Sequence, residues 1–196
     1  MRIIAGEFRR RRLMANPGLV TRPITDRAKE TLFQHLGDSI VESRVADVFA
    51  GTGSLGLEAL SRGASSVVFI EKDVRAHELL CRNVEKLGVE DRTMCWRTDV
   101  ARTSFQPKGL PNLLPYDIVF FDPPYALIPK IKPRSLLYRS LERLCRDAVT
   151  TPTARLLVRM PQRADWLGPE CWSLEDDILD IQSMKIRLFC KPEVSG

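Results

Sequence analysis

Residues 47–56, DVFAGTGSLG, decide the fold that the sequence predicts. The segment starts within a short apolar run, residues 45–50, and its three glycines fit the pattern G-x-G-x-x-G. In a strand–turn–helix crossover these glycines let the backbone approach a bound nucleotide closely. Glu71 ends the next apolar run, twenty positions after Gly51. A carboxylate there can accept hydrogen bonds from ribose hydroxyls, so the stretch predicts a cofactor-binding crossover.

The remainder of the chain alternates between strand and helix patterns. Such alternation predicts an α/β fold with a parallel sheet that is covered by helices on both faces. The expected strands are 45–50, 66–71, 93–99, 116–122 and 154–160, the expected helices are 54–62, 74–87 and 135–146, and residues 171–191 suit two further strands that join near Gln182. Residues 105–115, rich in Pro and Gly, are expected to form a surface loop.

The N-terminal part has a different pattern. Residues 1–4 and 9–15 suit two short strands of a basic hairpin, and a helix is expected after Thr25, which can cap it, with Gly37 as its stop signal. We therefore expect two parts, a basic hairpin-and-helix extension over residues 1–40 and a Rossmann-like domain over residues 41–196.

Composition and charge narrow the function classes. The chain has 196 residues, of which 44% are hydrophobic, and no apolar run long enough to span a bilayer. We expect no secretory signal, and the five scattered cysteines indicate neither a metal site nor a disulfide framework, so a reducing, cytoplasmic setting is expected. Residues 1–30 carry eight basic and three acidic side chains, which accounts for the whole net charge of +5. This excess fits a polyanion partner, although a solvated arm would show the same composition.

Two further carboxylates bear on the choice of cofactor. Asp47 lies four residues before Gly51, where it would be close to the pyrophosphate of NAD but suits the ammonium and sulfonium groups of S-adenosylmethionine. Asp99 ends the third expected strand and could accept a hydrogen bond from an adenine amino group. Either residue could instead cap a strand end, yet Asp47, Gly51, Gly53 and Glu71 together favour adenosylmethionine.

The segment FFDPPY, residues 120–125, is the most specific motif in the chain. Two consecutive prolines fix the backbone and remove two N–H donors, which leaves carbonyl oxygens and the Asp122 carboxylate as acceptors. This arrangement suits a planar ring with an exocyclic amino group, which would donate to Asp122 and to the carbonyl of Pro123 while Tyr125 stacks on the ring. Asp122 would position the amine, and whether it also takes the proton stays open. Methyl transfer of this kind requires no metal.

Five blocks of the sequence resemble the RsmD family of bacterial methyltransferases, which act on guanine N2 of small-subunit ribosomal RNA. The blocks are MRIIAGEFRRRRL (1–13), TRPITDRAKETLF (21–33), DVFAGTGSLGLEALSRGA (47–64), FIEKD (69–73) and DIVFFDPPY (117–125). The chain departs from the family pattern at Phe8, where a tryptophan is usual, and at Arg10, where a glycine is usual.

The resemblance implies a class I methyltransferase sheet of seven strands, the last of them antiparallel. It implies S-adenosylmethionine as the cofactor and a pocket for the target base. It also implies that the basic hairpin binds RNA in an assembled or partly assembled small subunit. We expect a monomer that needs no metal and makes no membrane contact. The residues assigned to the cofactor are Asp47, Phe49, Gly51, Thr52, Gly53, Glu71, Lys72, Asp99 and Val100. Those assigned to catalysis are Asp122, Pro123 and Tyr125. Those assigned to RNA are Arg9, Arg10, Arg11, Arg12, Arg22, Arg27, Lys130 and Lys132.

Three alternatives stay open at this point. D/N-P-P-Y motifs also serve adenine N6 and other amino groups, so another N-methyltransferase is one of them. An NAD-dependent oxidoreductase is disfavoured by Asp47 and by the DPPY segment. A non-catalytic RNA-binding module is disfavoured because Asp122 and the cofactor carboxylates are intact.

Overall fold

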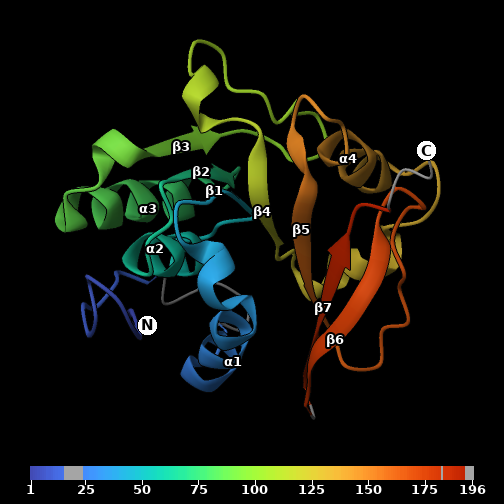
Figure 1. Ribbon diagram of the computed structural model, residues 1–196, viewed down its shortest axis with the longest axis horizontal. Helices are drawn as coiled ribbons and strands as arrows, with labels where there is room; N and C mark the ends of the chain where they lie inside the picture. The colour runs from blue at the N-terminus through green and yellow to red at the C-terminus, as the bar shows by residue number, and fades with distance from the viewer. Residues whose placement is uncertain (16–23, 182, 193–196) are drawn as a thin grey trace.

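A seven-stranded sheet forms the centre of the molecule (Figure 1). The computed structural model describes residues 1–15, 24–181 and 183–192. The strand order is β3-β2-β1-β4-β5-β7-β6, in which the first five strands pair in parallel and β7 is antiparallel to both of its neighbours. The predicted α/β fold, with an antiparallel last strand, is confirmed.

The elements follow the order that the sequence predicts. The strands are β1 (Arg44–Val48), β2 (Ser66–Glu71), β3 (Thr93–Arg97), β4 (Tyr116–Phe121), β5 (Thr150–Met160), β6 (Ser173–Ile181) and β7 (Met184–Cys190). The α-helices are α1 (Asp26–Leu36), α2 (Ser54–Ser61), α3 (Val74–Leu87) and α4 (Leu136–Leu144). Short 3-10 helices are η1 (Gly37–Ile40), η2 (Glu90–Arg92), η3 (Pro111–Leu113) and η4 (Tyr125–Lys130).

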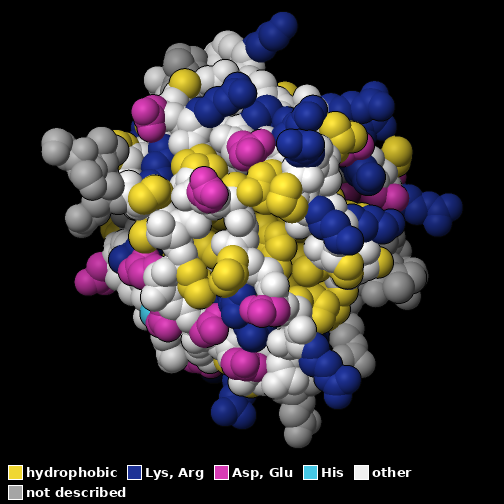
Figure 2. Space-filling model, turned by 90° about the vertical axis from the view of Figure 1, so that its right-hand side faces the viewer, with side chains coloured by type: hydrophobic (Ala, Val, Ile, Leu, Met, Phe, Trp, Pro, Cys, Tyr) yellow, Lys and Arg dark blue, Asp and Glu magenta, His cyan; other side chains and the backbone are white. Residues whose placement is uncertain are grey.

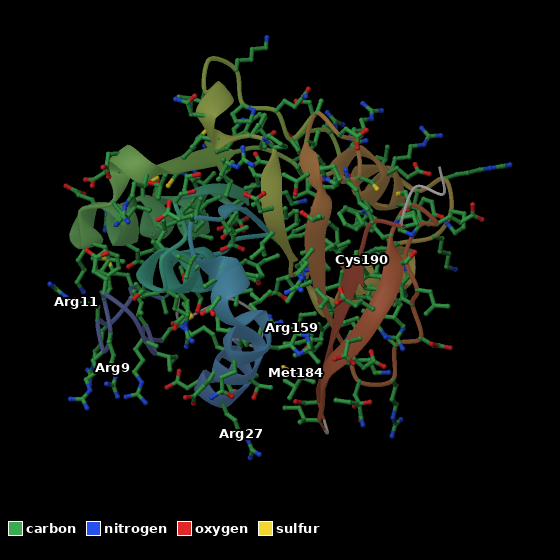
Figure 3. The ribbon with its side chains drawn as sticks, in the orientation of Figure 1. Arg9, Arg11, Arg27, Arg159, Met184 and Cys190 are labelled. Carbon is green, nitrogen blue, oxygen red and sulfur yellow. The ribbon has the colours of Figure 1, made fainter. Side chains whose placement is uncertain are left out.

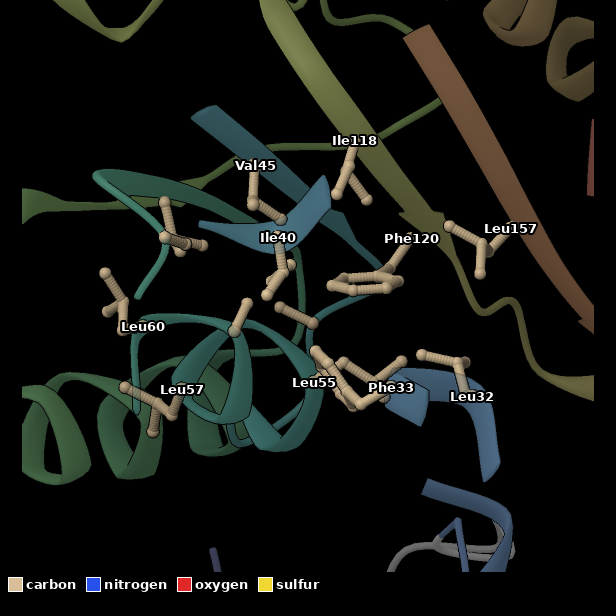
Figure 4. Close-up of a cluster of buried hydrophobic side chains, with 14 of the residues drawn as sticks. Leu32, Phe33, Ile40, Val45, Leu55, Leu57, Leu60, Ile118, Phe120 and Leu157 are labelled. Atoms are coloured by element: carbon tan, nitrogen blue, oxygen red, sulfur yellow. The ribbon is translucent and has the colours of Figure 1, made fainter. Parts of the chain in front are cut away.

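Helices cover the two faces of the sheet unequally. Helices α1, α2 and α3 pack on one face, where Phe33 of α1 meets Phe120 of β4 with ring centroids 5.6 Å apart (Figure 4). Helix α4 packs on the other face through Leu141 and Leu144, together with Phe105. Burial on both faces explains why β1, β2 and β4 read as continuous apolar runs in the sequence.

Strand β6 forms one edge of the sheet, at the right of Figure 1. Four carboxylates lie along it, at Glu175, Asp176, Asp177 and Asp180. Figure 2 shows this side of the molecule with acidic and basic side chains around a central group of hydrophobic ones. Charges on an edge strand oppose pairing with a strand of another chain.

The N-terminal arm, residues 1–15, forms a hairpin with less regular strand pairing than the sequence predicts. It contains one isolated bridge, between Arg2 and Arg12, in place of two strands. The backbone N–H groups of Ile4 and Ala5 donate instead to the Glu58 carboxylate on α2. The arm therefore docks on α2 through these two donors, while the N–H groups of Ile3, Arg10 and Leu13 donate between its two halves.

Within residues 105–115 the expected surface loop is anchored at its start. The Phe105 side chain is fully buried, and its carbonyl accepts a hydrogen bond from the Tyr116 hydroxyl. Among the described residues, none of the helices has the length and apolar character needed to cross a membrane.

Candidate active site

A cavity of about 540 Å³ opens at the carboxyl ends of the central strands. This is the edge of an open parallel sheet at which ligands bind, beside the point where the strand order reverses. Four carboxylates, Asp47, Glu71, Asp73 and Asp122, line the cavity together with Arg159. Tyr125 also lies in the lining. The cavity thus joins the glycine-rich crossover to the DPPY motif in one space.

The glycine loop, residues 49–53, leads from β1 into α2. The backbone N–H groups of Phe49 and Ala50 donate to the Ile70 carbonyl, which ties the loop to β2. Gly51 has φ 56° and Gly53 has φ 86°, both in the left-handed region that glycine adopts without strain. A Cβ atom on Gly51 would have no neighbour within 4 Å, whereas one on Gly53 would lie 2.6 Å from Leu80. Gly51 therefore keeps space open, and Gly53 permits close packing.

Asp47 is 2% exposed and lies near the end of β1. Its carboxylate accepts a hydrogen bond of 2.8 Å from the Gly56 N–H of α2. Burial raises the pKa of Asp47 to about 7, and the nearby carboxylates of Asp122 and Glu71 add to this. The side chain therefore joins β1 to α2. When ionised it also places a buried negative charge at the cavity, and a cationic ligand would offset the free-energy cost of that charge.

Glu71 fixes the glycine loop from the end of β2. One carboxylate oxygen accepts from the Gly51 N–H and the other from the Asp73 N–H, both at 2.8 Å. Lys72, the next residue, also lines the cavity, and its Nζ lies 4.0 Å from Asp99. The carboxylate that the sequence assigns to a ribose is thus held rigidly at the cavity.

Three of the residues assigned to the cofactor lie outside the cavity lining. Gly53 packs against Leu80, Val100 is 3% exposed within the core beside α4, and Asp99 is half-buried. Asp99 accepts a hydrogen bond from the Ala101 N–H, so it shapes the turn after β3. The structure brings together the other six residues, with Thr52 buried in the loop between Gly51 and Gly53.

The DPPY motif, residues 122–125, directly follows β4. The Asp122 N–H donates to the Val48 carbonyl, which fixes the motif to β1, and Pro123 is buried. Tyr125 begins η4 and is half-buried. Burial raises the pKa of Asp122, and the charge of Arg159 opposes this rise.

Arg159 is a site residue that our sequence analysis did not assign. Its Nε donates to Asp122 Oδ1 at 2.6 Å, and its guanidinium carbon lies 5.7 Å from the centroid of the Tyr125 ring. A charged residue within the apolar run of β5 is the signal that could have revealed it.

The N-terminal arm forms part of the cavity wall through Met1 and Ala15. Asn83 of α3, which is fully buried, accepts a hydrogen bond from the Met14 N–H and donates to the Thr52 carbonyl. One buried amide thus links the arm to the glycine loop, and no local pattern in the sequence indicates this link.

The basic residues assigned to RNA lie on the surface wherever the structure describes them. Arg9 to Arg12 are exposed on the arm and Arg27 on α1, and Figure 3 shows Arg9, Arg11 and Arg27 directed away from the body of the molecule. Lys130 and Lys132 are exposed beyond the DPPY motif. Arg22 lies outside the described residues.

Among the described residues there is no group of three or more His, Cys, Asp or Glu side chains that could hold a metal ion. The five cysteines are all free thiols.

Known proteins are similar to this chain in sequence and in fold. A family model described as conserved hypothetical protein 95 matches residues 1–176. The ribosomal RNA small subunit methyltransferase D of Haemophilus influenzae is 35% identical over 179 residues, which cover 89% of this chain and 86% of the relative. The protein of the same name from Escherichia coli is 41% identical over 127 residues, or 64% of this chain and 60% of that protein.

Solved structures agree with these relatives. A putative methyltransferase from Escherichia coli superposes with a TM-score of 0.78 at 32% identity, covering 97% of both chains. A putative methylase from Haemophilus influenzae superposes with a TM-score of 0.71 at 32% identity, covering 98% of both. The chain belongs to the family that this model describes, the RsmD family of ribosomal RNA small subunit methyltransferases that its sequence blocks resemble.

Proposed function

We propose that this protein transfers a methyl group from S-adenosylmethionine to the exocyclic N2 of a guanine in small-subunit ribosomal RNA. The single cavity that joins the glycine loop to Asp122 and Tyr125 carries this proposal. It gives a methyl donor and an aromatic amine one shared space. The family and the names of the relatives support the same reaction and substrate.

The cavity fits the cofactor in its shape and its charge. The space beside Gly51 admits a ligand close to the backbone, and Glu71 offers acceptors to ribose hydroxyls. Asp47 offers a buried carboxylate to a cationic group, with Phe49, Thr52 and Lys72 beside it. We propose that Gly53, Asp99 and Val100 support this site by shaping its turns. When bound, adenosylmethionine would supply an electrophilic methyl group. The amine lone pair would form the new N–C bond as the S–C bond breaks with its electrons on sulfur, and the nitrogen would lose one proton to Asp122 or to solvent.

The chain's own residues would orient the target amine. The lone pair of an aromatic amine is delocalised into its ring, which makes the nitrogen a weak nucleophile. Hydrogen bonds from both N–H groups to Asp122 and to the Pro123 carbonyl favour a more tetrahedral nitrogen and direct its lone pair towards the methyl group. Tyr125 would stack on the base, which is worth about 1–3 kcal/mol and offsets part of the cost of unstacking it. Orientation of this kind supplies much of the rate acceleration in a displacement between two bound partners.

We further propose that residues 1–40 form the RNA-binding extension. The exposed run Arg9 to Arg12 and Arg27 would bind phosphates, with Arg22 beside them in the sequence and Lys130 and Lys132 near the base pocket. The substrate would be an assembled or partly assembled small ribosomal subunit, and the enzyme would act as a monomer in the cytoplasm.

The test is incubation of the protein with tritiated adenosylmethionine and either naked rRNA or small subunits from a strain that lacks the enzyme. We expect labelled N2-methylguanosine after digestion of the RNA to nucleosides. Label in N6-methyladenosine would show that the base is wrong, and label in neither RNA would contradict an rRNA substrate. Calorimetry should also show that the protein binds adenosylhomocysteine. Binding of NAD alone would contradict the proposed methyltransferase function.

Asp122→Ala provides the catalytic control. This variant should lose nearly all methyl transfer and keep its affinity for adenosylhomocysteine. Asp147→Ala removes a carboxylate that is 93% exposed, and it should leave both quantities unchanged.

A further inference from the structure

Arg159 is the buried basic residue of the cavity, and the methyl transfer proposed above gives it no role. Among the described lining residues the other basic side chain is Lys72, which is 62% exposed and faces Asp99. The Arg159 side chain is 9% exposed. Burying a guanidinium costs free energy unless it is paired, so this position requires a specific partner.

The sheet register brings Arg159 to the DPPY motif. Phe121 of β4 pairs with Val158 of β5 in parallel, so the residues that follow, Asp122 and Arg159, lie at the same level of the sheet. The Nε···Oδ1 distance of 2.6 Å makes this a short, charge-assisted hydrogen bond. The guanidinium also lies within cation–π distance of the Tyr125 ring. One side chain thus contacts both residues that are proposed to hold the base.

The charge of Asp122 depends on this contact. Burial favours a neutral carboxyl group and raises the pKa of Asp122. The Asp122 charge in turn raises the pKa of Asp47, which shares the cavity. Arg159 is the group that lowers the Asp122 pKa. A neutral carboxyl group would present an O–H donor to the amine and lose part of its accepting capacity. In the ionised form both oxygens can accept and each accepts more strongly, so this form orients the amine better than the neutral acid.

We propose that Arg159 is a positioning residue for methyl transfer, which holds Asp122 as an oriented anion beside Tyr125 so that the carboxylate can accept a hydrogen bond from the target amine. This inference rests on the proposed function. Arg159 acts through Asp122 and does not itself contact the methyl group. A merely structural ion pair would stabilise the fold, and its loss would change neither kcat nor the pH dependence of methyl transfer in the variants that still fold.

The first test compares Arg159→Met with Arg155→Met. Arg155 lies four residues earlier on the same strand and binds Ser39 away from the cavity. We expect Arg159→Met to lower kcat by roughly 10- to 100-fold, as the loss of a charge-assisted hydrogen bond predicts, and to change the affinity for adenosylhomocysteine by less than about 3-fold. Arg155→Met should change neither. A higher KM for RNA with an unchanged kcat would overturn the proposal, since it would make Arg159 a phosphate ligand.

The pH profile separates positioning from packing. Without Arg159 the Asp122 pKa rises, so the carboxyl group is protonated at low pH and kcat of Arg159→Met should increase with pH, where the wild-type kcat is flatter. Arg159→Lys keeps the positive charge and should recover about 10-fold of the lost rate. Identical pH profiles for the wild type and Arg159→Met would contradict the proposal. Arg159→Gln replaces Arg159→Met if the latter does not fold.

A double-mutant cycle and a titration complete the test. In an Asp122→Asn background Arg159→Met should cost less than about 3-fold, because its effect passes through the carboxylate. Carbon-13 NMR of the Asp122 carboxyl, assigned with Asp122→Asn, should show a higher titration midpoint in ligand-free Arg159→Met than in the wild type. An unchanged midpoint, or the same rate loss in both backgrounds, would overturn the proposal. If the midpoint rises in Arg159→Met but the wild-type protein methylates no RNA, the effect of Arg159 on Asp122 is supported and the proposed function is contradicted.

Discussion

The ammonium group of Lys29 on α1 lies 3.0 Å from the carboxylate of Glu58 on α2, and both side chains are almost fully buried. Burial lowers the pKa of Lys29, and its attraction to Glu58 opposes this. The ammonium also donates to the Arg2 carbonyl, while Glu58 accepts from the Ile4 and Ala5 N–H groups. This pair therefore anchors the arm that carries Arg9 to Arg12.

Replacement of Lys29 by methionine should destabilise the protein. The change leaves the Glu58 charge buried without its ammonium partner, and breaking one side of a buried pair typically costs about 3–5 kcal/mol. Arg62, whose Nε donates to Glu58, should reduce this cost to roughly 3 kcal/mol. Urea unfolding measures the change, with the exposed neighbour Glu30→Gln as control. Equal stability of Lys29→Met and the wild type would show that the pair contributes no net stability.

Alanine substitution of the two loop glycines should affect different properties, stability at Gly53 and cofactor affinity at Gly51. Gly53→Ala places a Cβ atom 2.6 Å from the buried Leu80 side chain at φ 86°, so we expect a loss of about 2–4 kcal/mol in unfolding free energy. Gly51→Ala meets no atom within 4 Å, so its cost should be about 1 kcal/mol from the backbone alone. Because Gly51 lines the cavity, its variant should instead lose at least about 10-fold in cofactor affinity. Urea unfolding and calorimetry with adenosylhomocysteine give the two quantities, and a reversed order would contradict these roles.

Local signals in the sequence predict the elements well. Helix α3 spans Val74–Leu87 as expected, because Asp73 caps its start by accepting from the Ala76 N–H and Gly88 ends it at φ 68°. Both signals lie next to the helix in the sequence. The central strands β1, β2 and β4 are equally local, since each is an apolar run beside turn residues.

Contacts between distant residues were not predictable in the same way. The apolar run in β5 indicates a strand, but it does not identify the partner of Arg159, which depends on the register with β4. Asn83 reads as an ordinary polar helix residue, yet it lies buried between Met14 and Thr52. Asp99 also lies outside the cavity lining because its carboxylate accepts a hydrogen bond from the Ala101 N–H within the turn after β3.

Arg10 occupies a backbone conformation that favours glycine, at φ 67°. The turn of the arm therefore persists where the family usually has glycine, at a cost in strain. Arg10→Gly should raise the unfolding free energy by about 0.5–1 kcal/mol, since glycine adopts this conformation freely. Arg11→Gly, at a position without a positive φ, should lower it by a similar amount. Urea unfolding of the two variants tests this, and destabilisation by both would contradict the strain at Arg10.

The arginine run should set the salt dependence of RNA binding. Replacing Arg9 to Arg12 by glutamine removes four exposed charges, so affinity should fall and the slope of log K against log salt should flatten by about 2 to 3. Replacement of the same four residues by lysine keeps the charge and should keep the slope. Filter binding at several salt concentrations provides the measurement. A slope that is unchanged in the glutamine variant would assign the run to solubility.

Asp47 should link pH, stability and cofactor binding. Its pKa of about 7 in the folded protein lies above the ordinary value of 3.8, so the folded state holds the proton more tightly than the unfolded chain. The stability of the ligand-free protein should therefore fall as pH rises from about 4 to about 7, and it should stay at the lower level above that. Asp47→Asn removes this cost while its amide oxygen can still accept from Gly56. We expect the variant to be more stable than the wild type by roughly 4 kcal/mol at pH 8, with little difference at pH 4.

Cofactor binding should change with pH in the opposite direction to this stability. A cationic ligand favours the ionised carboxylate, so the affinity of wild-type protein for adenosylmethionine should rise as pH increases through 7. Asp47→Asn should bind it more weakly and without this pH dependence. Thermal unfolding and calorimetry from about pH 4 to about 8.5 measure both effects on one pair of proteins. If Asp47→Asn gained no stability at pH 8 and bound the cofactor as tightly as the wild type, the Asp47 carboxylate would serve only to join β1 to α2.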